Sequence, residues 1–389
     1  MEKLVYLWYP VIVILLLWGT KFYGKKAWNE EFMSLSQTKM IQGFLAVCIL
    51  FHHAAQKTCA SWLHPLFVVH GLDFFVAIGH LFVAVFLFCS GYGLYKSVKS
   101  KENYLQGFVK KRVVPIIVAF YVTAIIFTIV RALMGQKMDL PQVLRYLVGV
   151  QLSNPNAWYV IAIPIFYMGF YLSFRFIKKE GWAIAGTGLV VFLYVLIGTF
   201  VDHNDYLMCG EWWYNTAHMF VVGILFAKYE KGIIERVKKH YLIHLIIGLV
   251  AVPLLYEWSN VMQGIFSYYG ETWGAPDTVF RRWMSLLSQV ISTASFVWAV
   301  LLLNLKLKIG NPILKFMGTI TLEFYLIHGA FVELFGYSFL DLAPSLHYIR
   351  NVALYVLVLI ACTVPSAYLL HKFLNVLCYG KRKKESSNV

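Results

Sequence analysis

The stretch IQGFLAVCILFHHAA, residues 41–55, decides how the rest of this chain is interpreted. It is apolar almost throughout, yet it contains two adjacent histidines near its end, His52 and His53. An imidazole at membrane depth is costly and rarely faces lipid. It indicates either a site of chemistry or transport, or a hydrogen bond between packed helices. The stretch alone leaves both explanations open.

The composition places this stretch in a membrane protein. Of the 389 residues, 60% are hydrophobic and only 14% are charged, which is too apolar for a soluble globular domain. Apolar runs long enough to cross a bilayer lie at 4–20, 41–56, 74–94, 113–131, 157–175, 182–201, 214–228, 240–257, 282–304, 313–335 and 348–372. The sequence therefore predicts an all-α, polytopic bundle of about 10–11 transmembrane helices.

The distribution of Lys and Arg predicts the orientation. Most of the 34 Lys and Arg residues fall in alternate loops and in the tail at 381–384, and such basic loops face the cytoplasm. We therefore expect a multi-pass protein of the cell (plasma) membrane, with a cytoplasmic C-terminus and an outside N-terminus. The net charge of +15 then reflects a basic face against anionic membrane lipid, and no nucleic-acid partner is expected.

No internal repeat or linker divides the chain. We expect one membrane-embedded unit over residues 1–380, with its core at 41–372 and a short basic tail at 381–389. The six cysteines form no CxxC pair and show no metal-ligand spacing. Neither a metal site nor redox chemistry is predicted from them.

Helical phase separates the two histidines. Gln42 and His53 are eleven residues apart, close to three helical turns, so they share one stripe while His52 points about 80° away. His53 would lie about 16 Å beyond Gln42 along the helix. A group that reaches His53 from the cytoplasm must therefore be long and thin.

A basic segment precedes the fourth apolar run. Lys110 and Lys111 have an ordinary explanation, because basic residues at a membrane edge extend toward lipid phosphate. Arg112 stands three residues before Pro115 at an expected helix start, where its planar guanidinium would suit a phosphorylated ligand. Near the end of the preceding run, the small residues Ser90 and Gly91 permit close helix approach.

The run at 313–335 carries two polar faces. Thr321, Tyr325 and His328 share one face of a helix, and Glu323 lies about 140° from His328. Such a helix is expected inside the bundle. The expected outer loops are rich in residues that either stack on sugar rings or form an interfacial belt: His203, Asp205, Trp212, Trp213, Tyr268, Tyr269 and Trp273.

Taken in order, several segments resemble the acyltransferase-3 family of integral membrane acyltransferases, which acylate cell-surface glycans and related acceptors. Each segment is short, and the ordered set is the specific feature. The segments are 42–46 through His52-His53, Phe86 to Tyr92, Arg112 to Pro115, Ala157 to Tyr159, Gly223 to Ala227, and Gly318 to His328.

The chain departs from the family pattern at two positions. Gln42 stands where the family usually has Arg or Lys, although Lys39 lies one turn earlier. Val109 stands where the family often has the first Arg of an Arg-x-x-Arg pair, with Lys110 and Lys111 beside it. These departures concern the cationic contacts more than the histidine.

The resemblance implies transfer of an acyl group, acetyl in the first instance, from a cytoplasmic acyl-CoA to a hydroxyl of an extracytoplasmic acceptor, expected to be a cell-surface glycan. Acyl-CoA (acetyl-CoA) would be a co-substrate, with no bound cofactor. His53 would act as general base or transient acyl carrier. Arg112, with Lys110 and Lys111, would bind the acyl-CoA phosphates. The weaker candidates for lining the tunnel or polarising the thioester carbonyl are Gln42, Ser90, Tyr325, His328 and Glu323.

Two alternatives remain at this stage. One is a secondary transporter or flippase for a small polar or lipid-linked substrate, with His53, Glu323 and His328 as a proton relay, although the chain lacks the inverted repeats common in transporters. The other is a catalytically idle member that senses or scaffolds. The sequence does not name the acceptor, the acyl chain length or the oligomeric state.

Overall fold

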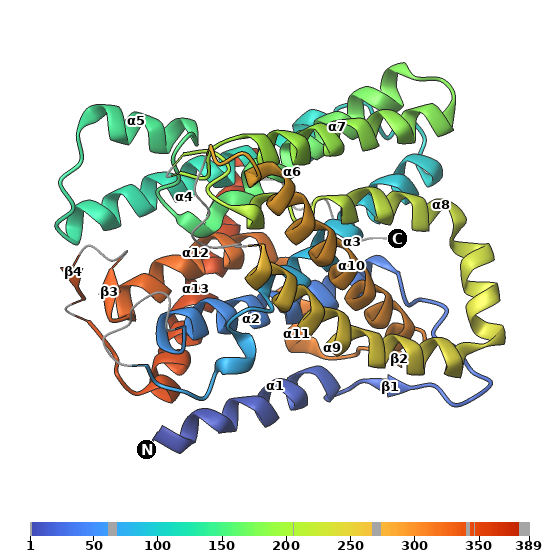
Figure 1. The fold of residues 1–389 in the computed structure, drawn as a ribbon, viewed down its shortest axis with the longest axis horizontal. Helices are drawn as coiled ribbons and strands as arrows, with labels where there is room; N and C mark the ends of the chain where they lie inside the picture. Colours follow the sequence, from blue (N-terminus) through green and yellow to red (C-terminus); the bar gives the residue numbers. More distant parts are fainter. Residues whose placement is uncertain are drawn as a thin grey trace.

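The computed structural model describes residues 2–60, 68–204, 206–266, 274–339, 343–345 and 347–380. The predicted tail at 381–389 and the loop residues Asp205, Tyr268, Tyr269 and Trp273 lie outside this part of the chain. Within it, the fold is almost entirely helical (Figure 1). The α-helices are α1 (Trp8–Leu17), α2 (Leu35–Thr58), α3 (Gly79–Ser100), α4 (Val114–Leu133), α5 (Leu140–Val148), α6 (Tyr159–Phe176), α7 (Glu180–Phe200), α8 (His218–Lys239), α9 (Tyr241–Ile265), α10 (Thr278–Asn304), α11 (Pro312–Thr319), α12 (Thr321–Phe335) and α13 (Val352–Tyr379).

Two short antiparallel strand pairs join distant segments. β1 (Lys21–Phe22) pairs with β2 (Leu307–Lys308), which ties the loop after α1 to the end of α10. β3 (Ser338–Phe339) pairs with β4 (Ala343–Pro344) between α12 and α13.

The predicted all-α, polytopic class is confirmed. Seven of the described helices are long and apolar enough to cross a bilayer: α3, α4, α6, α7, α9, α10 and α13, of which α4 and α6 are extended by their preceding turns. The remaining predicted runs also contain helix. α1 belongs to a shorter apolar helix, and α2 and α8 are long but carry more polar residues.

The run predicted at 313–335 is not one helix. It divides at Ile320 into α11 and α12. The Thr319 hydroxyl donates to the Phe316 carbonyl at 2.6 Å, and the Thr321 hydroxyl donates to the Met317 carbonyl at 2.9 Å. Side chains that bond to backbone in this way compete with the helical ladder, and β-branched residues are poor helix formers.

Glycines bring the central helices into contact. A β-carbon added at Gly91 of α3 would collide with the Phe220 carbonyl oxygen of α8, and one added at Gly223 of α8 would collide with the Phe88 carbonyl oxygen. α2 and α11 cross in the same way, because a β-carbon on Gly43 would lie 2.7 Å from the Gly318 nitrogen. Close crossings of this kind need small residues.

α2 occupies the centre of the bundle, and its middle residues Leu50, Ala54 and Ala55 are completely buried. It packs against α3, α11 and α12, while α1 and α7 lie at opposite edges of the view in Figure 1. α9 is the least buried of the seven long apolar helices. The histidines of α2 therefore face other helices rather than the periphery.

Candidate active site

Three histidines from two helices form a contiguous cluster. The ring centroids of His52 and His53 on α2 are 4.8 Å apart, and those of His53 and His328 on α12 are 5.1 Å apart. His328 is completely buried. His80, at the start of α3, interacts electrostatically with His52. The structure thus brings together the predicted His53 and His328, and adds His80, which the sequence analysis did not single out.

All four rings are anchored through the same atom, because each Nδ1 lies within hydrogen-bond distance of an oxygen that only accepts. The pairs are His52 with the Phe75 carbonyl (2.8 Å), His53 with Gln56 Oε1 (3.1 Å), His80 with the Ala77 carbonyl (3.0 Å) and His328 with the Tyr325 carbonyl (2.7 Å). The hydrogen of a neutral ring must therefore sit on Nδ1, which leaves a lone pair on Nε2. Each ring presents a basic nitrogen.

Two of these basic nitrogens are buried without a partner in the described part of the chain, Nε2 of His80 and Nε2 of His328. A buried polar atom without a hydrogen bond is uncommon and costs about 1–3 kcal/mol. The basic nitrogen of His328 lies in the same cluster as His53. It is therefore available to a proton donor that enters the cluster.

The cluster continues into a row of hydroxyl groups. The Tyr325 hydroxyl donates to the Asn156 carbonyl oxygen, and the Tyr325 ring lies 5.8 Å from that of Tyr159 on α6. The Ser90 Oγ lies 3.5 Å from the Tyr159 hydroxyl oxygen. The predicted residues Ser90, Tyr325 and His328 therefore lie along one row, with Tyr159 between Ser90 and Tyr325.

A turn before α6 fixes this row against α12. The Asn154 amide donates to the Leu326 carbonyl at 3.0 Å, and its oxygen accepts from the Asn156 backbone nitrogen at 3.0 Å. A β-carbon at Gly329 would lie 3.0 Å from the same oxygen. The Ala157 to Tyr159 segment matched the family pattern, but its sequence predicted no role for Tyr159. The sequence feature that could have indicated a role for Tyr159 is the polar turn directly before the apolar run of α6.

One end of the α2 and α12 pair is rich in charge. Glu323, at the start of α12, accepts a hydrogen bond from His371 of α13 at 2.9 Å. Lys39 of α2 interacts electrostatically with both Glu323 and Arg112. Glu323 therefore pairs with α13, on a different face from His328, as its helical phase indicated. Gln42 lies one turn beyond Lys39, is partly buried, and forms no hydrogen bond to the described residues.

The basic segment before α4 belongs to the same end. Lys110, Lys111 and Arg112 are exposed and lie in a single π-helical turn, Val109–Val113, and such turns are frequent at functional sites. The Arg112 guanidinium lies 5.9 Å from the Tyr104 ring. It also interacts electrostatically with Tyr167, which itself contacts Ser90. Of the three predicted cations, Arg112 therefore lies nearest to the hydroxyl row.

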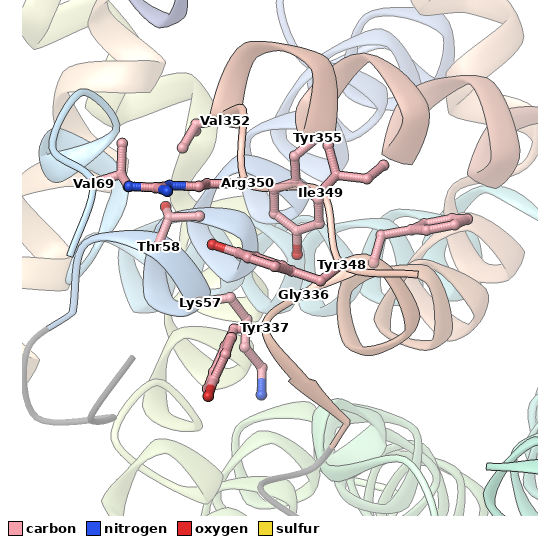
Figure 2. A pocket seen from close by; sticks show the side chains of 11 residues that line it. Lys57, Thr58, Val69, Gly336, Tyr337, Tyr348, Ile349, Arg350, Val352 and Tyr355 are labelled. Atoms are coloured by element: carbon pink, nitrogen blue, oxygen red, sulfur yellow. The ribbon is translucent and has the colours of Figure 1, made fainter. Parts of the chain in front are cut away.

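The opposite end of the pair holds a surface hollow (Figure 2). Lys57, in the last turn of α2, forms an ion pair with Glu333 of α12 at 2.9 Å. Glu333 also interacts electrostatically with Arg131. The hollow is lined by Lys57 itself and by residues that include Thr58, Tyr337, Tyr348, Arg350 and Tyr355. The sequence did not predict this ion pair, because Lys57 and Glu333 are far apart in the chain.

A second buried polar cluster links α10 to the turn before α8. The Glu211 carboxylate accepts from Ser285 at 2.9 Å and from Gln289 at 2.6 Å, and Gln289 accepts from Asn215 at 2.6 Å. The Arg282 guanidinium donates to the carbonyl oxygens of Thr199, in the last turn of α7, and of Val201, directly after it. The sequence feature that could have indicated this cluster is the helical spacing of Arg282, Ser285 and Gln289 along the otherwise apolar α10. This cluster cross-links three segments of the fold.

Among the loop residues predicted either to stack on sugar rings or to form an interfacial belt, Trp213 is 2% exposed, and its ring lies 6.4 Å from that of Trp158. Trp213 therefore packs in the interior. The part of the chain that the structure describes contains no group of three or more His, Cys, Asp or Glu arranged to hold a metal ion.

These features define an integral membrane protein of many helices, with buried basic imidazoles joined to a cationic end by a row of hydroxyls. The acyltransferase-3 family model, described as an acyltransferase domain, matches residues 39–372. The chain belongs to this family, as its sequence segments indicated. No curated protein and no solved structure matched the chain. The protein is therefore a multi-pass membrane acyltransferase.

Proposed function

We propose that this acyltransferase moves an acyl group, acetyl in the first instance, from cytoplasmic acyl-CoA to a hydroxyl of an acceptor on the outer face, a cell-surface glycan. The observation that supports this most strongly is the arrangement of the histidine cluster. His53 and His328 both present a basic Nε2 inside the bundle, and a row of hydroxyls runs from them toward Arg112.

The donor would bind at the cationic end. Lys110, Lys111 and Arg112 offer exposed positive charge in one turn, and a guanidinium forms paired, charge-assisted hydrogen bonds with phosphate. Lys39 lies close enough to Arg112 to interact with it electrostatically. It would supply the positive charge that an Arg or Lys provides in the family at the position of Gln42. The slender pantetheine arm would follow the hydroxyl row and carry the thioester to the histidines.

The imidazoles would then accept the proton of the acceptor hydroxyl. As the hydroxyl oxygen forms a bond to the acyl carbon, its proton passes to Nε2 of His53, the carbon–sulfur bond breaks, and the departing thiolate takes up the proton. The Nδ1 contact with Gln56 would hold the ring in the required tautomer. The alternative is a transient acyl group on His53 itself.

The geometry favours a proton-accepting role for His328 over carbonyl polarisation. A neutral ring with its hydrogen on Nδ1 has no hydrogen at Nε2 to donate to a carbonyl oxygen. The transporter alternative finds less support, because Glu323 of the supposed relay bonds to His371 rather than to a member of the histidine cluster.

The proposal is tested with purified protein in liposomes and radiolabelled acetyl-CoA. We expect slow release of CoA and acetyl transfer to added glycan, and a loss of about 10²- to 10⁴-fold in His53→Ala. His240→Ala, at an exposed histidine between α8 and α9, is the control and should keep wild-type rates. A protein that neither binds nor hydrolyses acetyl-CoA would refute the proposal, as would full activity in His53→Ala.

A further inference from the structure

The Tyr104 side chain places a buried hydroxyl beside the basic turn Val109–Val113. Its oxygen is buried and forms no hydrogen bond within the described part of the chain, and the Arg112 guanidinium lies 5.9 Å from its ring. We propose that the Tyr104 hydroxyl binds the pantetheine arm of acyl-CoA by donating a hydrogen bond to the amide carbonyl nearest the phosphates. This inference rests on the proposed function and adds a specific donor-binding residue to it.

The packing around Tyr104 accounts for its ring but not for its hydroxyl. The ring centroid of Phe108, which is buried, lies 5.8 Å from that of Tyr104 in an edge-to-face arrangement. A phenylalanine at position 104 would make the same contact without burying a polar atom. Because buried polar atoms nearly always have hydrogen-bond partners, the hydroxyl points to a ligand that supplies one.

Tyr104 lies between the predicted phosphate contacts and the hydroxyl row. Tyr167 of α6 interacts electrostatically with Arg112 and with Tyr104. Tyr167 also contacts Ser90, the first residue of the row, and its ring centroid lies 6.2 Å from that of Phe108. A donor whose phosphates lie on Arg112 and whose thioester follows the row would therefore pass Tyr104 with the start of its pantetheine arm.

The surroundings of the hydroxyl favour a neutral group of the donor over a phosphate. Lys110, Lys111 and Arg112 are exposed, so they can hold phosphate where water still solvates it. A phosphate that moved inward to the buried hydroxyl would lose that water, which is costly for a charged group. An amide carbonyl is neutral and accepts a hydrogen bond from a hydroxyl. The first amide after the phosphates meets both requirements.

Tyr104 stands on an irregular turn between the end of α3 and the basic turn. Two residues of this turn, Asn103 and Gly107, have positive φ angles of 52° and 65°, which a helix does not contain. The ring can therefore shift toward an arriving donor without unwinding a helix.

The test gives purified protein in detergent three acetyl donors of decreasing length. Acetyl-CoA carries the phosphates and both amides, S-acetylpantetheine keeps both amides without the phosphates, and S-acetyl-N-acetylcysteamine keeps only the amide near the sulfur. We expect Tyr104→Phe to lower kcat/KM for the first two donors about two- to tenfold, the effect of one neutral hydrogen bond, and to leave the third unchanged. Arg112→Ala should lower kcat/KM for acetyl-CoA alone.

Matched measurements separate the hydroxyl from folding. The thermal midpoint of Tyr104→Phe without donor should not fall, because the hydroxyl has no hydrogen bond to the described residues to lose. Tyr121→Phe removes an exposed hydroxyl on α4 and should behave as wild type. Unchanged kcat/KM for S-acetylpantetheine in Tyr104→Phe would overturn the inference, as would an equal fall for all three donors. Wild-type protein that releases no CoA at all would instead refute the proposed function.

Discussion

The two ends of the α2 and α12 pair each place a lysine of α2 near a glutamate of α12, but different residues surround the two charge pairs. At each end α2 supplies a lysine and α12 a glutamate: Lys39 near Glu323, and Lys57 paired with Glu333. Near the first pair lie Arg112 and its exposed basic turn, while around the second lie tyrosines. Because the histidines lie between the two ends, this difference supports the proposal that the phosphates of acyl-CoA bind at the Arg112 end and that the acceptor approaches from the other end.

The largest effect at either end is expected at the basic turn. Arg112→Ala should raise KM for acetyl-CoA by about 10- to 100-fold, because a charge-assisted hydrogen bond is worth about 1.5–3 kcal/mol. KM for the acceptor should stay constant. The matched control is Arg175→Ala, an exposed arginine in the last turn of α6. Steady-state kinetics with each substrate varied in turn measure both KM values. If Arg112→Ala raised only the KM for the acceptor, the donor and acceptor ends would have to be exchanged.

A smaller effect, on stability, is expected at the other end. Lys57→Ala leaves the buried Glu333 carboxylate without its lysine partner, which should lower the free energy of unfolding by about 1–3 kcal/mol. Lys57→Arg keeps the charge and should recover most of this loss. Thermal unfolding of the detergent-solubilised protein measures the difference. Equal midpoints for the alanine variant and wild type would show that the ion pair does not hold α2 to α12.

Helical phase predicted the inner part of the site well. It placed Tyr325 with His328 but apart from Glu323, and in the structure Glu323 bonds to His371. It also turned His52 away from His53, yet the two rings lie 4.8 Å apart in one cluster. Phase is a local property, so a single helix reveals it. The hydrophobic runs likewise predicted the helical bundle, although not the break at Ile320.

Contacts between distant segments were beyond the reach of the sequence. The position of Tyr159 depends on Asn154, which bonds to α12 across 172 residues of chain. The pairing of Lys57 with Glu333, and hence the hollow around it, depends on how α2 and α12 end together. Such pairings follow from tertiary packing, which no periodicity within one helix encodes.

The central proposal is that the acyl group passes from the Arg112 end of the bundle to an acceptor at the opposite end by way of His53. It is tested most directly in sealed, uniformly oriented proteoliposomes, with radiolabelled acetyl-CoA on the side of Arg112 and an acceptor glycan trapped on the other side. The account predicts label on the trapped glycan in wild type and in His240→Ala, and none in His53→Ala. Label that reaches the glycan only when both substrates share one side, or intact labelled acetyl-CoA in the lumen, would contradict it.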